Sequence, residues 1–235
     1  MDTGARLAPQ ALAALELFHG LSPAALGDVM AYARVRHLAR DTRIFDQGDP
    51  DVRAHALIDG GVRISQSGSD GAQIVMRFIG PREMFGTVAL FTDGRYPADA
   101  VTLAASLEAS WSEAELFELM GRHPQIAINV IRVIGKRLQE VQDRLREVST
   151  QRVEQRVAHA VLRLAGQAGH RTIDGTAIEF PLRRRDVADM SGTTLYTASR
   201  ILTGWEKAGF LVSRSQRLTI RQPSEILRVA EDSAH

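Results

Sequence analysis

A heptad pattern near the middle of the chain constrains its fold more than any other feature. The spacing predicts one long helix, opened by Pro124 and running over 124–150, with a narrow apolar seam. Because a helix buried within one chain usually has a wider apolar face, the seam favours pairing with the same helix of a second chain. An antiparallel neighbour within the same chain is the alternative. The seam residues, alternately three and four positions apart, are Ile131, Ile134, Leu138, Val141, Leu145 and Val148.

The residues before this helix follow two other patterns. Residues 7–36 predict short helices, one with Ser22 as N-cap and Pro23 at its first position. From 37 to 110, short alternating runs are separated by turn residues, as in antiparallel sandwiches and barrels. Turns are expected at 59–61 and 70–71, where glycine supplies a positive φ. The expected strand runs are Arg43–Phe45, His55–Ile58, Val62–Ser65, Gln73–Ile79 and Val101–Leu107.

The residues after the long helix hold most of the basic charge. Residues 1–150 have 16 Arg and Lys against 19 Asp and Glu, whereas 151–222 have 12 against 6. The total of +1 hides this asymmetry, which indicates an anionic partner for the C-terminal region, with a solvated charged face as the alternative. Val153–Leu164 predicts an amphipathic helix, and Thr172–Phe180 predicts two short strands.

Residues 182–203 predict two short helices joined by a turn at Gly192, which requires a positive φ. Thr193 or Thr194 is expected to cap the second helix. A hairpin is expected to follow, with its turn at 214–217. This arrangement of a helix-turn-helix and a wing can place its second helix in the major groove of DNA. The residues expected to face the core are Leu195, Ala198, Ile201, Leu202, Trp205 and Phe210.

Side chains that can contact DNA are expected on the outer face of the second helix and at the start of the first. Arg200 can pair with guanine through two hydrogen bonds, and Arg184 and Arg185 are assigned to phosphates. The expected DNA-binding residues are Arg184, Arg185, Thr194, Tyr196, Thr197, Ser199 and Arg200.

The order of these parts resembles the bacterial CRP/FNR superfamily of transcription regulators over about residues 15–222. The resemblance implies an α+β fold with an N-terminal cyclic-nucleotide-binding-like β-roll, a long dimerisation helix and a C-terminal winged helix-turn-helix. The implied domains are 1–123, 124–150 and 151–235. The matching segments are LFHGLS at 17–22, FDQGDP at 45–50, LIDGGVRI at 57–64, FGTVALF at 85–91 and DVADMSGTTLYTASRILTGWEKAGFL at 186–211.

This resemblance implies a homodimeric regulator that binds a two-fold symmetric site in double-stranded DNA under the control of an effector in the roll. RNA polymerase is a further expected partner if the protein activates transcription. The alternatives are an effector-independent regulator and a regulatory module that senses a cyclic nucleotide or another small molecule. No Ser-His-Asp spacing, P-loop or HExxH motif is present, so no enzyme is expected. The lack of a signal peptide or long apolar segment predicts a cytoplasmic protein without membrane contact.

Family members that bind a cyclic nucleotide offer a Glu to the ribose and an Arg-Ser pair to the phosphate. This chain has Thr87 in place of the Glu, and Pro97 and Ala98 in place of the pair. Val141 and Gln142 align with the residues that read the purine. Because a buried phosphate without its cation is costly, the resemblance implies an effector other than cyclic AMP held in the usual way. The implied effector-pocket residues are Gly86, Thr87, Val88, Arg95, Val141 and Gln142.

The absence of cysteine excludes an iron–sulfur cluster, which is the sensing chemistry of the oxygen-responsive branch. Haem is still a possible cofactor, because its iron can take a His as axial ligand and needs no cysteine. The stretch SGTTLYTASRILTGWEKAGFL is similar to that of nitric-oxide-responsive denitrification regulators (the NnrR/DNR-like branch), with Tyr196 where the usual Glu stands. The resemblance therefore implies nitric oxide, bound through haem, as the effector. The candidate haem ligands are His19, His37, His55 and His123.

Overall fold

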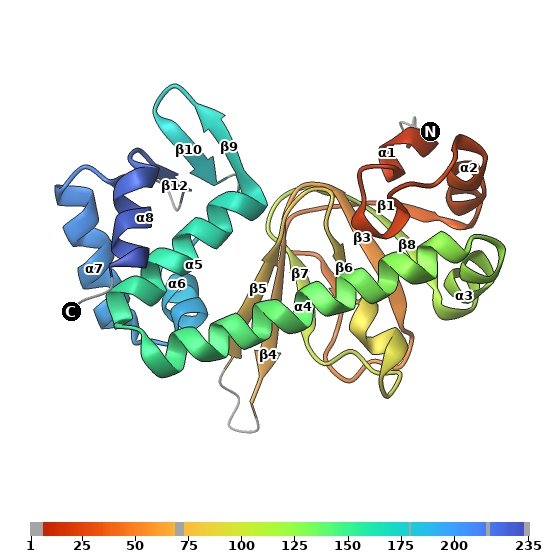
Figure 1. Cartoon of the computed structure of the whole chain (residues 1–235), viewed down its shortest axis with the longest axis horizontal. Helices are drawn as coiled ribbons and strands as arrows, with labels where there is room; N and C mark the ends of the chain where they lie inside the picture. Colours follow the sequence, from red (N-terminus) through yellow and green to blue (C-terminus); the bar gives the residue numbers. More distant parts are fainter. Residues whose placement is uncertain (1–6, 69–72, 179, 215–216, 233–235) are drawn as a thin grey trace. The chain divides into compact units, whose positions relative to one another are not determined.

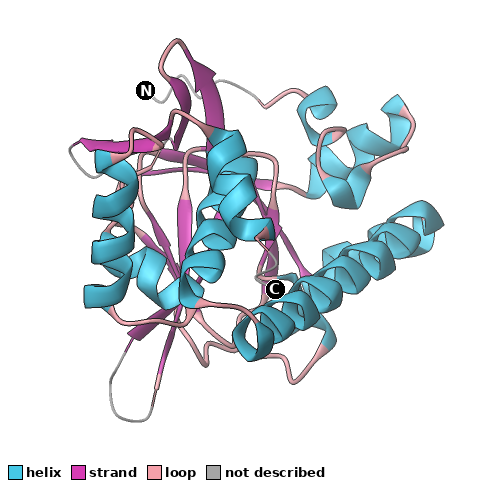
Figure 2. Cartoon of the chain, turned by 60° about the vertical axis from the view of Figure 1, so that its left-hand side comes forward, coloured by secondary structure: helices cyan, strands magenta, loops and turns pink. Residues whose placement is uncertain are grey.

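The structure is a computed structural model, and it describes residues 7–68, 73–178, 180–214 and 217–232. The chain divides into two compact units. The first consists of Met1–Gly60 and Gly80–Gln139, and the second of Gly61–Ile79 and Glu140–His235. Helix α4 (Pro124–Thr150) contributes residues to both units and is one continuous helix (Figure 2).

The helices of the first unit begin where their capping residues predict. The Ser22 hydroxyl accepts a hydrogen bond of 3.2 Å from the Ala25 N–H, and Pro23 follows at the first helical position, so the predicted cap is confirmed. Leu12, Leu15 and Phe18, spaced three apart, are all buried. The helices are α1 (Pro9–Leu12), η1 (Glu16–Phe18), α2 (Pro23–Tyr32), η2 (Thr87–Phe91), α3 (Glu113–Arg122) and the first part of α4.

Two groups of antiparallel strands complete the first unit. One is a sheet in the order β1-β8-β3-β6, and the other is the pair β2 and β7. The prediction of helix at 34–36 is wrong: these residues begin β1, which pairs with β8 from Arg34↔Ser110 to Leu38↔Ser106. The expected run Val101–Leu107 is two separate strands. The bounds are β1 (Arg34–Leu38), β2 (Arg43–Phe45), β3 (Arg53–Asp59), β6 (Met84–Phe85), β7 (Asp99–Thr102) and β8 (Ser106–Ser112).

The second unit combines a hairpin, the end of α4 and a helical bundle with its own sheet. Strands β4 (Val62–Ser67) and β5 (Gln73–Ile79) form the hairpin; its expected turn at 70–71 lies outside the described residues. The bundle, which Figure 1 shows around α5, is backed by a sheet in the order β11-β12-β10-β9. Its elements are α5 (Val153–Ala168), β9 (Gly169–Thr172), β10 (Gly175–Ile178), α6 (Arg184–Ser191), α7 (Leu195–Lys207), β11 (Leu211–Arg214), β12 (Arg217–Ile220) and α8 (Pro223–Glu231).

The core of this bundle is formed by the apolar faces of its four helices. Ala198, Leu202 and Trp205 of α7 are buried, and the Trp205 indole donates a hydrogen bond of 3.0 Å to Glu154. Three predicted core positions differ. Leu195 is 44% exposed because it stands at the first turn of α7, before the helix meets its neighbours, and Ile201 and Phe210 are only half-buried.

These observations confirm the α+β class, with a β-roll, a long helix and a winged helix-turn-helix. Helix α5 continues beyond the predicted end at Leu164 to Ala168, and β9 begins directly after it. Within the described ranges, no helix has both the length and the apolar character that crossing a membrane requires.

Candidate nucleic-acid interface and effector region

The two short helices α6 and α7 are joined by a turn whose shape depends on Gly192. This residue ends α6 in the left-handed region at φ 61°, which glycine adopts without strain. Thr194 then caps α7, since its hydroxyl accepts a hydrogen bond of 3.2 Å from the Thr197 N–H. The turn and the cap both agree with the prediction, and together they set the direction in which α7 leaves α6.

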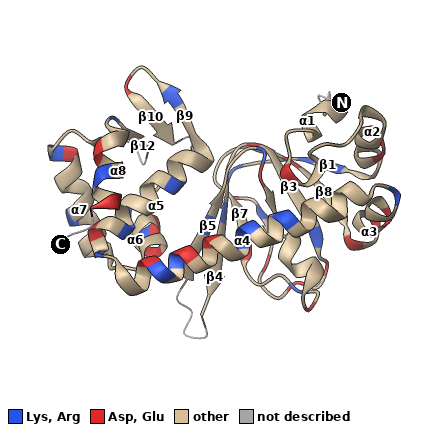
Figure 3. Ribbon diagram, in the orientation of Figure 1, with Lys and Arg blue, Asp and Glu red and all other residues tan. Residues whose placement is uncertain are grey.

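One face of α7 is available to a partner. Tyr196 is 78% exposed, Thr194 and Arg200 are exposed, and Thr197 and Ser199 are half-buried. These side chains offer hydroxyl groups and one guanidinium, which can donate to phosphates and base edges. These five residues stand at the N-cap and along the first two turns of α7, and each is at least partly accessible. Figure 3 shows further basic residues on α5, α7 and β9.

The two arginines assigned to phosphates already have partners within the chain. The Arg184 guanidinium donates to the Ser199 carbonyl and the Thr203 hydroxyl, both at 2.7 Å, and to Glu206 at 2.8 Å. It therefore braces α6 against α7. Arg185 forms one hydrogen bond of 2.9 Å, through Nε, to Asp189, and it stays exposed. Of the two, Arg185 has more of its guanidinium available for a phosphate.

The predicted seam of α4 is exposed to solvent along its whole length. Its six residues range from 41% exposed at Ile134 to 70% at Ile131. By contrast, Val130 and Val133, which neighbour the first seam residues in the sequence, are buried. A stripe of Ile, Leu and Val that the chain itself does not cover, at strict heptad spacing, fits a partner helix.

A buried hydrogen-bond network, not predicted from the sequence, lies in the first unit around His55. This side chain is 2% exposed and its partner Glu108 is fully buried. His55 Nδ1 donates to Glu108 Oε1 at 2.5 Å, and Arg36 Nε donates to Oε2 at 2.8 Å. On the other side of the ring, the Tyr96 hydroxyl lies 2.8 Å from His55 Nε2 and accepts from the Arg53 N–H at 2.7 Å.

Burial and hydrogen bonding set the charges of this network. Burial lowers the pKa of His55, so the ring is neutral and holds its proton on Nδ1. Burial alone would raise the pKa of Glu108, but the hydrogen bonds from His55 and Arg36 outweigh it, and the pKa lies below its usual value. Burial raises the pKa of Tyr96 to about 12. The network therefore consists of a carboxylate, a neutral imidazole and a neutral phenol.

The loop of the predicted effector pocket packs directly on this network. Gly86 has φ 72°, and a Cβ there would lie 2.8 Å from His55 Cδ2 and 2.9 Å from the Arg53 carbonyl oxygen. The rings of Phe45 and Tyr96 stack with centroids 3.7 Å apart. Side chains thus fill the interior beside Gly86.

The other predicted effector residues differ in exposure and belong to two different units. Thr87 is half-buried at the start of η2, and Val88 is 50% exposed. Arg95 is exposed and donates to the Gly48 carbonyl at 2.8 Å, so it does not stand in for the missing phosphate ligand within the roll. Val141 and Gln142 belong to the second unit, where both are exposed on α4.

The candidate haem ligands differ in their surroundings. Both ring nitrogens of His55 are engaged, which leaves none for iron. His123 is half-buried, and its Nε2 lies 2.9 Å from Asp28 Oδ2. His19 and His37 are exposed. None of the four combines burial with a free ring nitrogen, so these residues, as folded, do not fit an axial haem ligand.

Comparison with known proteins matches two domain families to successive parts of the chain. Residues 35–123 match the cyclic nucleotide-binding domain family, and residues 155–229 match the Crp-like helix-turn-helix domain family. A CRP-like cAMP-activated global transcriptional regulator of Mycobacterium tuberculosis is 26% identical over 89% of this chain and 97% of its own. The cyclic AMP receptor protein of Thermus thermophilus is 27% identical over 91% of this chain and 96% of its own.

A solved structure supports the fold. FixK2 from Bradyrhizobium japonicum has a TM-score of 0.74 with 21% identity, and the match covers 86% of this chain and 99% of that one. The two domain families follow one another along this chain, and the matches to the two regulators extend over nearly the whole of each. The chain is thus a transcription regulator of the CRP/FNR family, built from a cyclic nucleotide-binding domain and a Crp-like helix-turn-helix domain.

Proposed function

We propose that the protein is a homodimeric, sequence-specific regulator that recognises a two-fold symmetric DNA site through α7. The observation that carries this proposal is the division of α7 into two faces. Ala198, Leu202 and Trp205 are buried, while Tyr196 and Arg200 project to solvent. A helix held in this way by its own core can enter a major groove, which admits one α-helix.

The residues of α7 that would contact bases differ from the family pattern. The operator sequence is therefore expected to differ from the usual family half-site. Of the Arg, Glu and Arg that read the family half-site, the chain keeps only Arg200; Leu195 and Tyr196 stand at the other two positions. A neutral phenol is a weaker acceptor for the amino group of cytosine than a carboxylate, and it can also donate. The half-site is therefore expected to keep a guanine opposite Arg200 and to differ at the neighbouring base pairs.

Substituting Arg200→Ala should weaken binding to the selected operator by about 1–3 kcal/mol and relax the base preference at one position in each half-site. The loss follows from two missing hydrogen bonds to a guanine edge. Fluorescence anisotropy with the operator and with single-base variants measures both effects. Lys207→Ala, an exposed cation at the C-terminal end of α7, is the matched control and should leave base preference unchanged. An equal loss on random DNA would refute direct reading by Arg200.

Two copies of the chain are proposed to pair through the exposed seam of α4. Pairing would cover six apolar side chains that the chain itself leaves in water. It would also give the two recognition helices the two-fold relation that a palindromic operator requires. If the dimer activates transcription, RNA polymerase is its further partner.

The effector is proposed to be something other than cyclic AMP bound in the usual way, or to be absent in a constitutive regulator. Thr87, Pro97 and Ala98 lack the groups that hold the ribose and phosphate, and His55 and Tyr96 fill the space beside Gly86. Adding cyclic AMP is expected to leave the melting temperature and the operator affinity unchanged. A ligand at 100 times its dissociation constant would instead stabilise the protein by about 2.7 kcal/mol, which a thermal melt detects.

Nitric oxide sensing through haem, and with it membership of the NnrR/DNR-like branch, stays a prediction from the recognition-helix similarity. The surroundings of the four histidines do not favour it, since His55 would have to give up two hydrogen bonds to bind iron. The absorption spectrum of haem-reconstituted protein tests it. A Soret band that shifts on addition of nitric oxide would support this effector, and a spectrum equal to that of free haem would exclude it.

A regulatory module without DNA binding is the second function class. The cap at Thr194 and the left-handed turn at Gly192 count against it, because they organise a helix pair of the helix-turn-helix type. A gel-shift with a promoter library separates the two classes, since such a module would shift no fragment.

A further inference from the structure

Arg156 of α5 contacts three backbone carbonyl groups that belong to two different parts of the second unit. Its Nε donates to the Ser191 carbonyl at 2.9 Å, and its Nη2 donates to the Gly192 carbonyl at 3.2 Å. Its Nη1 donates to the Gln151 carbonyl at 3.0 Å. The planar fork of an arginine can bind several acceptors at once in a fixed geometry.

The first two carbonyls belong to the turn of the helix-turn-helix. Ser191 is the last residue of α6, and Gly192 is its left-handed C-cap. The last carbonyls of a helix have no partner within the helix, and a cation there is favourable. The same turn is closed by the Thr193 N–H, which donates to the Ala188 carbonyl at 3.0 Å. Arg156 therefore binds the C-terminal end of α6, where the backbone conformation is fixed by the turn.

The third carbonyl belongs to the linker between the long helix and the bundle. Gln151 lies between the end of α4 at Thr150 and the start of α5 at Val153. One guanidinium thus joins the linker to the turn that precedes α7. Because Arg184 braces α6 against α7, a rotation of the linker is passed on to the recognition helix.

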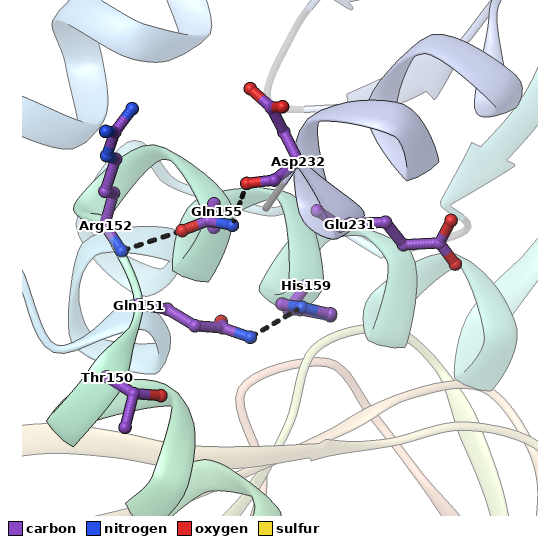
Figure 4. Close-up of a pocket in the computed structure, with 8 residues that line it drawn as sticks. Thr150, Gln151, Arg152, Gln155, His159, Glu231 and Asp232 are labelled. Atoms are coloured by element: carbon purple, nitrogen blue, oxygen red, sulfur yellow. Dashed lines mark hydrogen bonds between the residues drawn. The ribbon is translucent and has the colours of Figure 1, made fainter. Parts of the chain in front are cut away.

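Side-chain packing alone does not hold the linker in place. A hollow of about 490 Å³ adjoins it, lined by Thr150, Gln151, Arg152, Gln155, His159 and α8 residues (Figure 4). Hydrogen bonds join residues around this hollow: Gln151 Nε2 lies 3.3 Å from His159 Nε2, Gln155 Nε2 donates to the Asp232 carbonyl at 2.9 Å, and the Arg152 N–H donates to Gln155 Oε1 at 2.9 Å. The hydrogen bond from Arg156 to the Gln151 carbonyl adds to these and ties the linker backbone to the turn after α6.

We propose that Arg156 is a positioning residue for operator recognition: it fixes the direction of α7 relative to the dimer helix, and so fixes the spacing of half-sites that the dimer accepts. This inference rests on the proposed function. In a dimer of such units, each base pair inserted between half-sites turns one of them by about 34° around the DNA axis. A rigid connection between linker and turn makes the dimer intolerant of that rotation.

The test is a spacing scan with the full-length protein. Operators are made with the half-sites at the selected distance and one or two base pairs closer or farther, and affinity is measured by anisotropy. Wild-type protein should bind the selected spacing far better than its neighbours. In Arg156→Gln, loss of hydrogen bonds to two or three carbonyls should reduce this preference by about tenfold. Arg156→Lys, which cannot span all three carbonyls, should lie between the two.

The controls separate positioning from folding. Arg152→Gln removes the same charge from the linker without touching the three carbonyls, and its spacing profile should equal that of the wild type. If Arg156→Gln does not fold, Arg156→Lys serves in its place, since Arg163 still joins α5 to Glu147 of α4 at 2.6 Å and 2.9 Å.

The outcomes for Arg156 and for the proposed function differ. If Arg156 has only a structural role, Arg156→Gln should lower the melting temperature and weaken DNA binding by the same factor at every half-site spacing. A spacing preference equal to that of the wild type would overturn the inference. A wild-type protein that shows no spacing preference overturns the proposed dimeric recognition itself.

Discussion

Replacing Leu138 and Leu145 together by Asp is expected to leave the protein monomeric and to lower its affinity for a two-fold operator by about 10²–10⁴-fold. Both residues lie on the exposed seam of α4, at 58% and 68% exposure. In the proposed dimer each would pack against its counterpart, and two carboxylates there would be desolvated without partners. The monomer would keep its own core but lose the gain in affinity that comes from two linked half-site contacts. Sedimentation equilibrium and operator titration measure the two effects.

The control places one carboxylate on the same helix outside the seam. Gln139 is exposed and follows Leu138 directly, so Gln139→Asp should leave both the dimer and its affinity intact. Seam-substituted protein that still sediments as a dimer would contradict pairing through α4, and the partner of this stripe would then have to be sought elsewhere.

The second large effect is expected from His55→Phe in the β-roll. Phenylalanine preserves the ring, but it leaves Glu108 Oε1 without the donor that now lies 2.5 Å away. An ionised carboxylate that loses a hydrogen bond in a buried site destabilises the fold by about 3 kcal/mol. For a chain of this size that lowers the melting temperature by about 6–12 °C. The double substitution His55→Phe, Glu108→Leu removes both partners and should recover much of the loss, because Arg36 is partly exposed and can turn to water.

The same network predicts how stability depends on pH. Folding lowers the pKa of His55 from 6.5. As pH falls below 6.5, the unfolded chain therefore binds a proton at this residue before the folded chain does, and the free energy of unfolding decreases. The pKa of Glu108 is lowered from 4.5, and its contribution is lost as pH falls through its folded value. The free energy of unfolding should therefore decrease from pH 7.5 to pH 4. In His55→Phe the decrease between pH 7.5 and 5.5 should be smaller; equal slopes for the two proteins would contradict a neutral, buried His55.

Local patterns in the sequence predicted the elements whose causes are local. The heptad spacing indicated α4, Ser22 and Pro23 gave the start of α2, and Gly192 gave the turn before α7. In each case the deciding interaction joins residues a few positions apart, and the residue type shows it. Strand β1 was missed because its stability comes from pairing with β8, more than 60 residues away.

The parts of the site that the sequence did not predict depend on long-range contacts. The sequence predicts Arg184 as a phosphate ligand, but its guanidinium donates hydrogen bonds to α7. One acceptor is Glu206, 22 residues away, and no local pattern indicates this pairing. No local sequence pattern distinguishes Arg156, because its three acceptors are backbone carbonyls, which every residue has. His55 was considered as a haem ligand, whereas its position between Glu108 and Tyr96 becomes visible only in the folded roll.

Dimeric recognition of DNA is tested by selecting operators from a library of random duplexes and then measuring the protomers bound per duplex. We expect enrichment of a two-fold symmetric site with half-site centres about 10–10.5 base pairs, or a multiple of that, apart. We also expect a guanine opposite Arg200 in each half-site and two protomers per duplex. A library from which no sequence is enriched, or binding of single protomers to sites without symmetry, would contradict dimeric recognition.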